Sequence, residues 1–309
     1  MTRQAAARAA LLPLLAPLAA CAGRPATTAP APAAALDAFV VAHPDDWQLF
    51  MGDIAMDAVR AGRRVVLVYA TTGDAGIGEE YWRARERGAI ASAAFLMGVA
   101  PPDSANLLAG GTRPAACADV TLEGRTVHRC ALGTTVSYFL RLPDGNVNGS
   151  GFAATGMRSL ASMAAGGAPM TPLSGTGTYA TRADLATVVA GAIRAESRAG
   201  ALAVRVHATD PDSTYNPGEH ADHREAALAA ADAATRAGWP IVHYASYSTA
   251  RRPTNLDAER FGWKAGLFLA YDRARILAKR EWSAYCESPI YSEWLSRTYP
   301  RPAAAAGRD

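Results

Sequence analysis

The chain has 309 residues, of which 31 are Lys or Arg and 28 are Asp or Glu, giving a formal net charge of +3. It contains no run or stripe of basic residues, so nucleic acid is not an expected partner. Hydrophobic residues make up 50% of the sequence. About 270 residues remain beyond an N-terminal tether, enough for one large α/β domain with a full core.

The N-terminal residues have the pattern of an export signal. Arg3 and Arg8 precede an apolar stretch that is too short, and too interrupted by proline, to span a bilayer. The stretch ends in Leu18-Ala19-Ala20-Cys21. This resembles a bacterial lipobox, so we expect cleavage before Cys21 and lipid on its sulfur. An ordinary secretory signal is the alternative. The lipobox predicts an exported lipoprotein anchored to a membrane of the cell envelope, periplasmic or at the cell surface.

Composition divides the chain into four segments. We expect a signal peptide at 1–20 and a flexible tether rich in Pro, Ala and Thr at 21–36. A single folded domain follows at 37–299, and 300–309 is expected to be a disordered tail. No internal repeat is visible.

The cysteines suggest one disulfide. Cys117 and Cys130 are separated by twelve residues in a loop-rich stretch, and export places them in an oxidising compartment, so we expect them to pair. Cys286 is left over and is expected to be buried. Because the chain contains no Cys-x-x-Cys, a thiolate zinc site is disfavoured.

The first half of the domain alternates between strand and helix patterns. The run 37–42 predicts a strand, and Asp46 is placed to cap the helix that follows. The continuous apolar run 64–70 predicts a strand covered on both faces. A loop over 71–78 leads to a helix over 79–97.

The stretch 109–178 is different, because glycine and small polar residues dominate it. We expect a hairpin around 117–130, a turn at 143–146, and otherwise a long loop-rich insertion that covers the functional site. A surface excursion that touches nothing is the alternative.

Regular alternation then resumes. Helices are expected at 182–199, 221–237, 258–271 and 285–296, and strands at 201–207 and 241–245. Such alternation predicts βαβ units. The expected fold is therefore a three-layer α/β/α, Rossmann-like domain with a mostly parallel sheet.

Two polar motifs lie where predicted strands end. His43-Pro44-Asp45-Asp46 follows the first strand, and His220-Ala221-Asp222-His223 begins a later helix. The carboxyl ends of parallel strands form the ligand-binding edge of such sheets. Alone, the first motif could be a strand-end turn with a capping Asp. Together they predict a catalytic zinc or other divalent metal held by His43, Asp46 and His223, with one position open for water.

The same motifs resemble the LmbE/PIG-L family of zinc-dependent N-deacetylases, which act on N-acetylglucosamine-containing conjugates. Further matches are Thr71–Gly76, Tyr81–Glu86 and Leu142–Gly145, so the resemblance spans about 39–271. It implies Asp45 as the general base, His220 as a proton donor or an orienting residue, and Arg85 and Asp144 as substrate contacts. One departure is Trp47, because the family usually has Glu there.

The roles of the aromatic residues near the motifs, of Asp222 and of the remaining histidines are less defined by the sequence. Trp47, Tyr81 and Trp82 can stack on a sugar or belong to the core, and aromatic residues on helices usually belong to the core. Asp222 is expected to face away from the site or to interact with the helix dipole. The sequence assigns no role beyond structure to the histidines outside the two motifs, which are His128, His207 and His243.

The sequence thus predicts a hydrolase that removes an N-acetyl group from an amino-sugar conjugate or glycan. The sugar preference follows from the resemblance alone. Two alternatives remain: an amidase acting on a non-acetyl amide of such a conjugate, and a non-catalytic surface protein that binds glycans.

Overall fold

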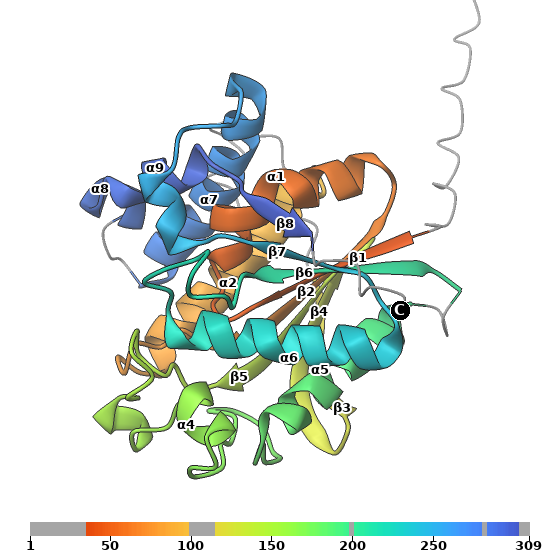
Figure 1. Cartoon of the computed structure of the whole chain (residues 1–309), viewed down its shortest axis with the longest axis vertical. Helices are drawn as coiled ribbons and strands as arrows, with labels where there is room; N and C mark the ends of the chain where they lie inside the picture. The colour runs from red at the N-terminus through yellow and green to blue at the C-terminus, as the bar shows by residue number, and fades with distance from the viewer. Residues whose placement is uncertain (1–34, 99–114, 198–200, 280–282, 303–309) are drawn as a thin grey trace, which may run out of the picture. The chain divides into compact units, whose positions relative to one another are not determined.

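The computed structural model of the chain describes residues 35–98, 115–197, 201–279 and 283–302 (Figure 1). The expected signal peptide, Cys21 and nearly all of the tether lie outside these residues. Within them, no helix is long and apolar enough to cross a membrane.

One eight-stranded sheet runs through the domain in the order β3-β4-β5-β2-β1-β6-β7-β8. The five inner strands are parallel, and the strands toward each edge pair antiparallel. The strands are β1 (Ala35–Val41), β2 (Arg64–Thr71), β3 (Ala116–Leu122), β4 (Arg125–Leu132), β5 (Thr135–Leu142), β6 (Ala203–Thr209), β7 (Ile241–Tyr244) and β8 (Pro300–Pro302). The chain runs from β1 to β2 on one side, and β6 lies on the other, so the strand order reverses between β1 and β6.

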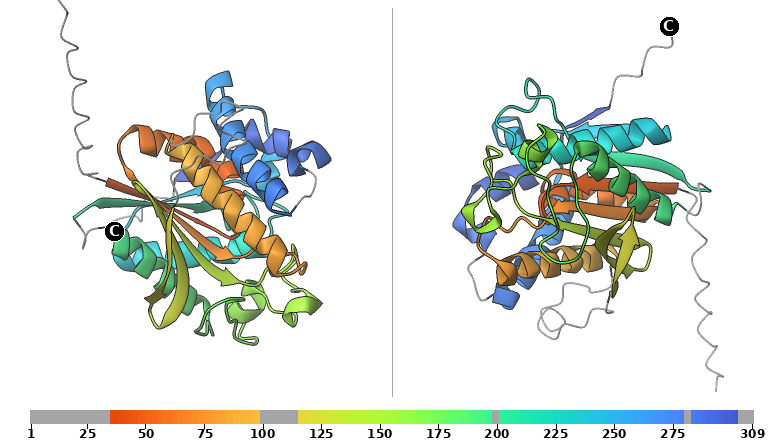
Figure 2. Two further views of the ribbon diagram at one scale, coloured as in Figure 1. Left: turned by 180° about the vertical axis from the view of Figure 1, so that it is seen from behind. Right: turned by 90° about the horizontal axis from the view of Figure 1, so that it is seen from below.

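Helices cover both faces of this sheet (Figures 1 and 2). One face packs against α1 (Asp46–Arg60), α2 (Glu79–Leu96) and α7 (Ala258–Lys279). The other packs against α4 (Leu160–Ala164), α5 (Arg182–Glu196) and α6 (Ala221–Ala237). Shorter elements are η1 (Ala153–Thr155), η2 (Tyr247–Arg251), α8 (Ala284–Glu287) and α9 (Ile290–Leu295). The expected α/β/α fold with a mostly parallel sheet is confirmed.

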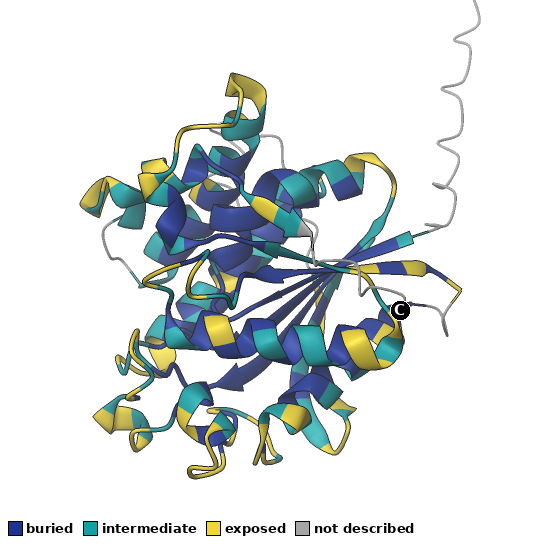
Figure 3. Ribbon diagram, viewed as in Figure 1, coloured by how far each residue is buried: buried dark blue, intermediate teal, exposed yellow. Residues whose placement is uncertain are grey.

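The apolar runs of the sequence explain why the sheet is sandwiched. Side chains of β1 point alternately to the two faces, so Val40 joins one core cluster and Phe39 joins the other. A strand that must be apolar on both faces is stable only between two helical layers. Figure 3 shows the central strands buried along their length.

The expectation of a loop-rich insertion over 109–178 needs correction. The expected hairpin is present as β3 and β4, but β5 is buried at every residue and pairs in parallel with β2. The strand has eight residues but stands in a stretch rich in glycine and small polar residues, which masked its Val-Ser-Tyr-Phe-Leu pattern in the sequence. The segment that follows β5 does reach the functional site, because Asn146, Val147 and Phe152 line its cavity.

The C-terminal region also differs from expectation. The helix expected over 285–296 is two short helices, interrupted next to Pro289. Cys286 is exposed and not buried. Residues 300–302, expected in a disordered tail, form β8 beside β7, and Arg301 donates two 2.6 Å hydrogen bonds to Asp210. Residues 303–309 lie outside the described residues.

Candidate active site

The first motif forms the turn between β1 and α1. The backbone N–H of His43 donates to Oδ2 of Asp46 at 2.7 Å, which folds that carboxylate back over the turn. Asp45 occupies the N-cap position of α1, and its side chain makes no capping hydrogen bond. The expectation that Asp46 caps the helix is therefore wrong, because its carboxylate faces inward.

The second motif starts α6 after the loop that leaves β6. His220 is the N-cap residue, and its Nδ1 accepts the backbone N–H of Asp222 at 3.1 Å. His223 follows within the first turn of the helix and is fully buried. Because β1 and β6 are neighbouring parallel strands, their carboxyl ends bring the two motifs together at the point where the strand order reverses.

Three donor atoms from these motifs face one another. Nε2 of His223 lies 3.0 Å from Nδ1 of His43 and 3.0 Å from Oδ1 of Asp46. The third distance, from Nδ1 of His43 to Oδ1 of Asp46, is 3.5 Å. Ligands placed tetrahedrally at 2.0–2.1 Å from a zinc ion are about 3.3 Å apart. The residues predicted as metal ligands are thus assembled at a spacing that fits one divalent ion.

Glu219 orients this set, a role that sequence reasoning missed. Its Oε1 lies 2.6 Å from Nδ1 of His223, and its other oxygen accepts hydrogen bonds from Asn216 and Ser246. Nδ1 therefore donates to a carboxylate, which leaves Nε2 to face the metal position. A carboxylate four residues before a ligand histidine was the available signal.

The electrostatics favour positive charge at this point. Burial opposes the charge of His223, but the carboxylates of Asp46 and Glu219 outweigh burial and raise its pKa to about 10. Burial likewise opposes ionisation of Asp46, but His223 and His43 hold the pKa of Asp46 well below its usual range. The proton on His223 balances the negative charge of the neighbouring carboxylates, and a metal cation can take its place.

A second group of donors surrounds the other nitrogen of His43. Its Nε2 has no hydrogen-bond partner among the described residues and lies 3.6 Å from Asp222 and 3.8 Å from Asp144. Both carboxylates already accept backbone N–H groups, from Gly145 and Asn146. Oδ1 of Asp222 has no hydrogen-bond partner among the described residues, but the separations in this group are wider than in the first, so it is the poorer metal set. It also shows that Asp222 faces the site and not away from it.

Asp45 is held beside the metal position by Arg85. The guanidinium of Arg85 pairs with Oδ1 of Asp45, and it also donates to the hydroxyl of Tyr271 at 2.9 Å and to the carbonyl of Gly73 at 2.6 Å. Gly73 has a φ of +58°, and a Cβ there would lie 2.2 Å from the guanidinium. Arg85 lines the cavity as expected of a substrate contact, but its donors are taken up by Tyr271, Gly73 and Asp45, so it also holds Asp45 in place.

His220 is neutral in this arrangement. Burial, together with the positive charges of His43 and His223, lowers its pKa to about 2. Since Nδ1 accepts a backbone N–H, the single ring hydrogen is on Nε2, 3.9 Å from the carboxylate of Asp144. His220 therefore offers a neutral N–H donor in the position where the resemblance implies a proton donor or an orienting residue.

The motifs open into a cavity of about 220 Å³. His43, Asp45, Asp46 and His220 line it, and other lining residues are Asp144, Asn146, Val147, Phe152, Tyr247 and Trp294. The rings of Tyr247 and Trp294 stack at 4.9 Å. These aromatic residues come from η2 and α9, outside both motifs, and no pattern along the chain marked them as part of the site.

A family model described as "PIG-L: GlcNAc-PI de-N-acetylase" matches residues 38–234, more than half of the chain. The chain belongs to the PIG-L family. The resemblance inferred from the motifs is confirmed, and membership of a family of de-N-acetylases supports an N-deacetylase activity. No curated protein matches the sequence.

Solved structures similar to this PIG-L family member include deacetylases. One is a triple mutant of a deacetylase of teicoplanin biosynthesis, with 13% identity, a TM-score of 0.43, and coverage of 84% of this chain and 88% of that one. Another is N,N'-diacetylchitobiose deacetylase from Pyrococcus horikoshii, with 16% identity, a TM-score of 0.41, and coverage of 86% and 82%. Identities and scores this low support no statement about substrate.

The position at which this chain departs from the PIG-L family pattern lies in the core. Trp47 is fully buried, and its indole N–H donates to the hydroxyl of Tyr69 at 2.8 Å. Trp82 is also buried. Neither ring is exposed to stack on a sugar, and neither lines the cavity, so the Trp at position 47 belongs to the core. Tyr81 lines a smaller cavity beyond Arg85.

Proposed function

We propose that this protein is a zinc-dependent N-deacetylase that hydrolyses the acetamide of an N-acetylglucosamine-type conjugate or glycan. One observation carries the proposal. Donor atoms of His43, Asp46 and His223 converge at 3.0–3.5 Å from one another, beside an aspartate that binds none of them and lines the same cavity. This is the arrangement that hydrolysis by an activated water requires.

His43, Asp46 and His223 would hold the metal, and Glu219 would fix the ring of His223. The bound ion would supply a water of lowered pKa and would polarise the acetamide carbonyl. Two nitrogens and one oxygen are the donor set of a catalytic site that keeps a position open.

The remaining groups handle protons. Asp45 is paired with Arg85 and faces the cavity, so it is placed to take the proton of the attacking water and to pass it to the amide nitrogen. The Nε2–H of His220 is placed to donate to the carbonyl oxygen as that oxygen gains negative charge. The products are acetate and a free amine.

Other residues that line the cavity favour a sugar substrate. Asp144 and Asn146 offer polar groups for hydroxyls, and the stacked Tyr247 and Trp294 offer an aromatic surface for a ring face. Asp144 is fixed because its backbone N–H donates to Asp74 at 2.8 Å. The backbone of Asp144 is therefore held in place for the proposed contact with substrate.

The test combines metal analysis of the purified protein with release of acetate from N-acetylated saccharides. We expect one zinc per chain, activity lost on chelation and restored by zinc. Release of another acid from N-acyl analogues, without acetate from any N-acetyl sugar, would replace the deacetylase with an amidase. Stoichiometric zinc without turnover of any amide would favour a glycan-binding protein.

We also propose that Cys21 anchors the enzyme to a membrane of the cell envelope. The support is the Leu18-Ala19-Ala20-Cys21 pattern behind a short apolar segment. Cys21→Ser should release the protein from the membrane fraction in its producing cell, while the specific activity of the folded domain is retained. Retention of the variant in that fraction would contradict lipid attachment.

A further inference from the structure

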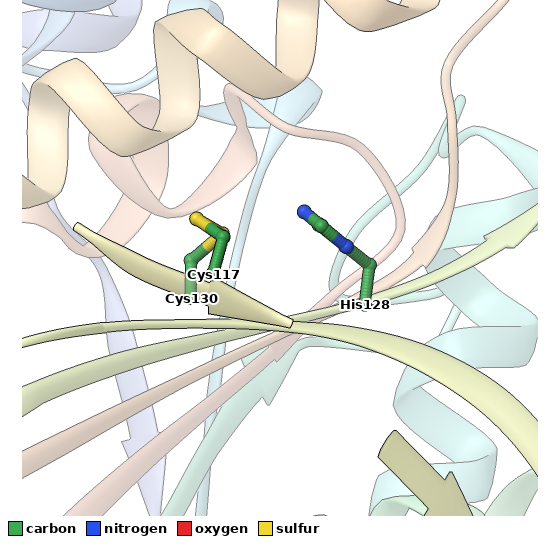
Figure 4. Close-up of side chains that lie close together, drawn as sticks. All are labelled: Cys117, His128 and Cys130. Carbon is green, nitrogen blue, oxygen red and sulfur yellow. A yellow bond between two sulfur atoms is a disulfide. The ribbon is translucent and has the colours of Figure 1, made fainter. Parts of the chain in front are cut away.

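The β3–β4 hairpin gathers metal-binding side chains at the edge of the sheet. Cys117 pairs directly with Cys130 across the two strands, and Asp119 pairs directly with His128. The two pairs are two residues apart on each strand, so all four side chains project from the same face. Figure 4 shows the two sulfurs and the ring of His128 on one side of the hairpin.

These groups are close enough to share a ligand. A ring nitrogen of His128 and the two sulfurs lie within 4.8 Å of one another. Nδ1 of His128 lies 2.7 Å from Oδ1 of Asp119, so this nitrogen donates to the carboxylate. The other ring nitrogen keeps its lone pair. A carboxylate that fixes the ring in this way is the usual companion of a metal-bound histidine.

In the structure Cys117 and Cys130 form a disulfide, so neither sulfur is a thiolate. We propose that, once this disulfide is reduced, Cys117, Cys130 and His128 bind a zinc ion, with water as the fourth ligand. The hairpin then has two alternative cross-links at one place, a covalent bond when oxidised and a metal when reduced. Asp119 is the positioning residue of this site.

The chemistry balances with a dithiol as the reductant, such as the active site of a thiol–disulfide oxidoreductase. Two electrons and two protons pass to the sulfurs, which become two thiols, while the dithiol becomes a disulfide. Zinc binding then releases both thiol protons. The sulfurs must separate to about 3.8 Å, the spacing set by Zn–S bonds of about 2.3 Å. With the Cα atoms 4.0 Å apart, rotation about the Cα–Cβ bonds supplies this.

Solvent access and surroundings suit such a site. Cys117 is exposed, whereas Cys130 is 3% exposed and packs in the core cluster that includes Phe139. An ion can therefore enter from outside and be shielded on its inner side. The site is separate from the catalytic one, because β4, β5 and β2 lie between β3 and β1 in the sheet.

Cobalt distinguishes the two sites, because thiolate ligands give Co²⁺ an intense near-ultraviolet absorption that nitrogen and oxygen ligands do not. The protein to use is the mature chain carrying Cys21→Ser and Cys286→Ser, reduced with a phosphine and titrated with Co²⁺. We expect one thiolate-bound Co²⁺ per reduced chain, displaced by Zn²⁺, and no such band from the oxidised chain.

Variants then test each ligand. Cys117→Ser should abolish the band, His128→Ala should weaken Co²⁺ binding, and Asp119→Asn should weaken it about 10- to 100-fold. His243→Ala, on β7, is the matched control and should leave the titration unchanged. A reduced chain without the band would overturn the proposal. So would a band of unchanged affinity in His128→Ala, since that indicates a simple dithiol complex.

The outcome is independent of the proposed deacetylase. His223→Ala removes a ligand of the catalytic set and should leave the thiolate band intact. Absence of acetate release together with a normal band would remove the proposed function alone.

Discussion

Strands β1 and β6 position a cluster of buried histidines beyond their carboxyl ends and a single buried histidine inside β6. At the carboxyl end are His43 and, after β6, His223. Inside β6, opposite Phe39 of β1, is His207, whose Nδ1 accepts from the hydroxyl of Tyr244 and whose Nε2 donates to Asp37, both at 2.8 Å. All three histidines are buried, at 5%, 0% and 2% exposure respectively. Burial and residue type therefore do not distinguish a structural histidine from a ligand.

The difference is in how the nitrogens are satisfied. Both nitrogens of His207 have partners, and its ring stacks on Phe39 at 4.5 Å, so nothing remains for a ligand. Nε2 of His43 has no partner among the described residues, and its Nδ1 faces another ring nitrogen at 3.0 Å. Buried polar groups are nearly always paired. The ring of His43, with one buried nitrogen unpaired and the other beside His223 and Asp46, therefore fits a site that can hold a cation.

The largest expected effect comes from the carboxyl-end cluster. His223→Ala removes one of three ligands, so bound zinc should fall from one per chain to none and activity to background. Metal analysis and acetate release measure this. His207→Leu is the matched control, because it removes a buried histidine from the same strand pair and should leave the metal in place. Loss of metal in both variants would contradict the assignment of His223 as a ligand and His207 as a structural residue.

Asp45→Asn is expected to separate metal binding from proton transfer. The amide keeps the shape of the side chain but cannot accept a proton, so kcat should fall about 10²- to 10⁴-fold while zinc stays stoichiometric. Steady-state kinetics on an N-acetyl sugar, with metal analysis of the same sample, provide the measurement. Unchanged turnover would remove Asp45 as the base.

Glu219→Gln should have a smaller effect, through the ring of His223. The amide still bonds to that ring but no longer contributes negative charge, so zinc affinity should drop about 10- to 100-fold. Competition with a chelator of known affinity measures the drop. Saturating zinc should restore most of the activity, and a defect that persists at saturation would assign Glu219 a direct part in the reaction.

Inside β6, His207→Leu should affect stability and not function. It leaves the hydroxyl of Tyr244 and one contact of Asp37 unpaired, which should lower the free energy of unfolding by about 1–3 kcal/mol. Burial lowers the pKa of His207 and outweighs Asp37, while Arg205 and Arg63 act in the same direction as burial. The unfolded chain, with a histidine pKa of about 6.5, therefore binds more protons below that pH.

The stability contributed by neutral His207 is therefore complete above pH 6.5 and is lost as the pH falls through the window down to its folded pKa. Denaturant unfolding of the wild type and of His207→Leu between pH 5 and 8 compares the two. The difference in stability between them should shrink as the pH drops. A difference that grows toward acid would mean that His207 is charged in the folded protein.

Much of the fold could be read from local patterns. The helix expected at 221–237 has those bounds in the structure, because an alanine-rich amphipathic run between an N-cap and a glycine defines both ends locally. Strand β5 was missed because it stands in a stretch rich in glycine and small polar residues, and only its pairing with β2 shows that it belongs to the parallel part of the sheet. The two motifs predicted His43, Asp46 and His223 as a set, because the carboxyl ends of neighbouring parallel strands meet at one edge of the sheet.

The sequence by itself determined the α/β alternation, the polar motifs at two strand ends and the family. Only the tertiary structure decided which atoms face each other: that Asp222 turns inward, that Glu219 holds His223, and that His128 lies beside Cys117 and Cys130. Periodicity depends on neighbours along the chain and is visible in the sequence. The direction of a side chain and its partner across the sheet depend on strand register and helix packing between distant residues, which no local pattern specifies.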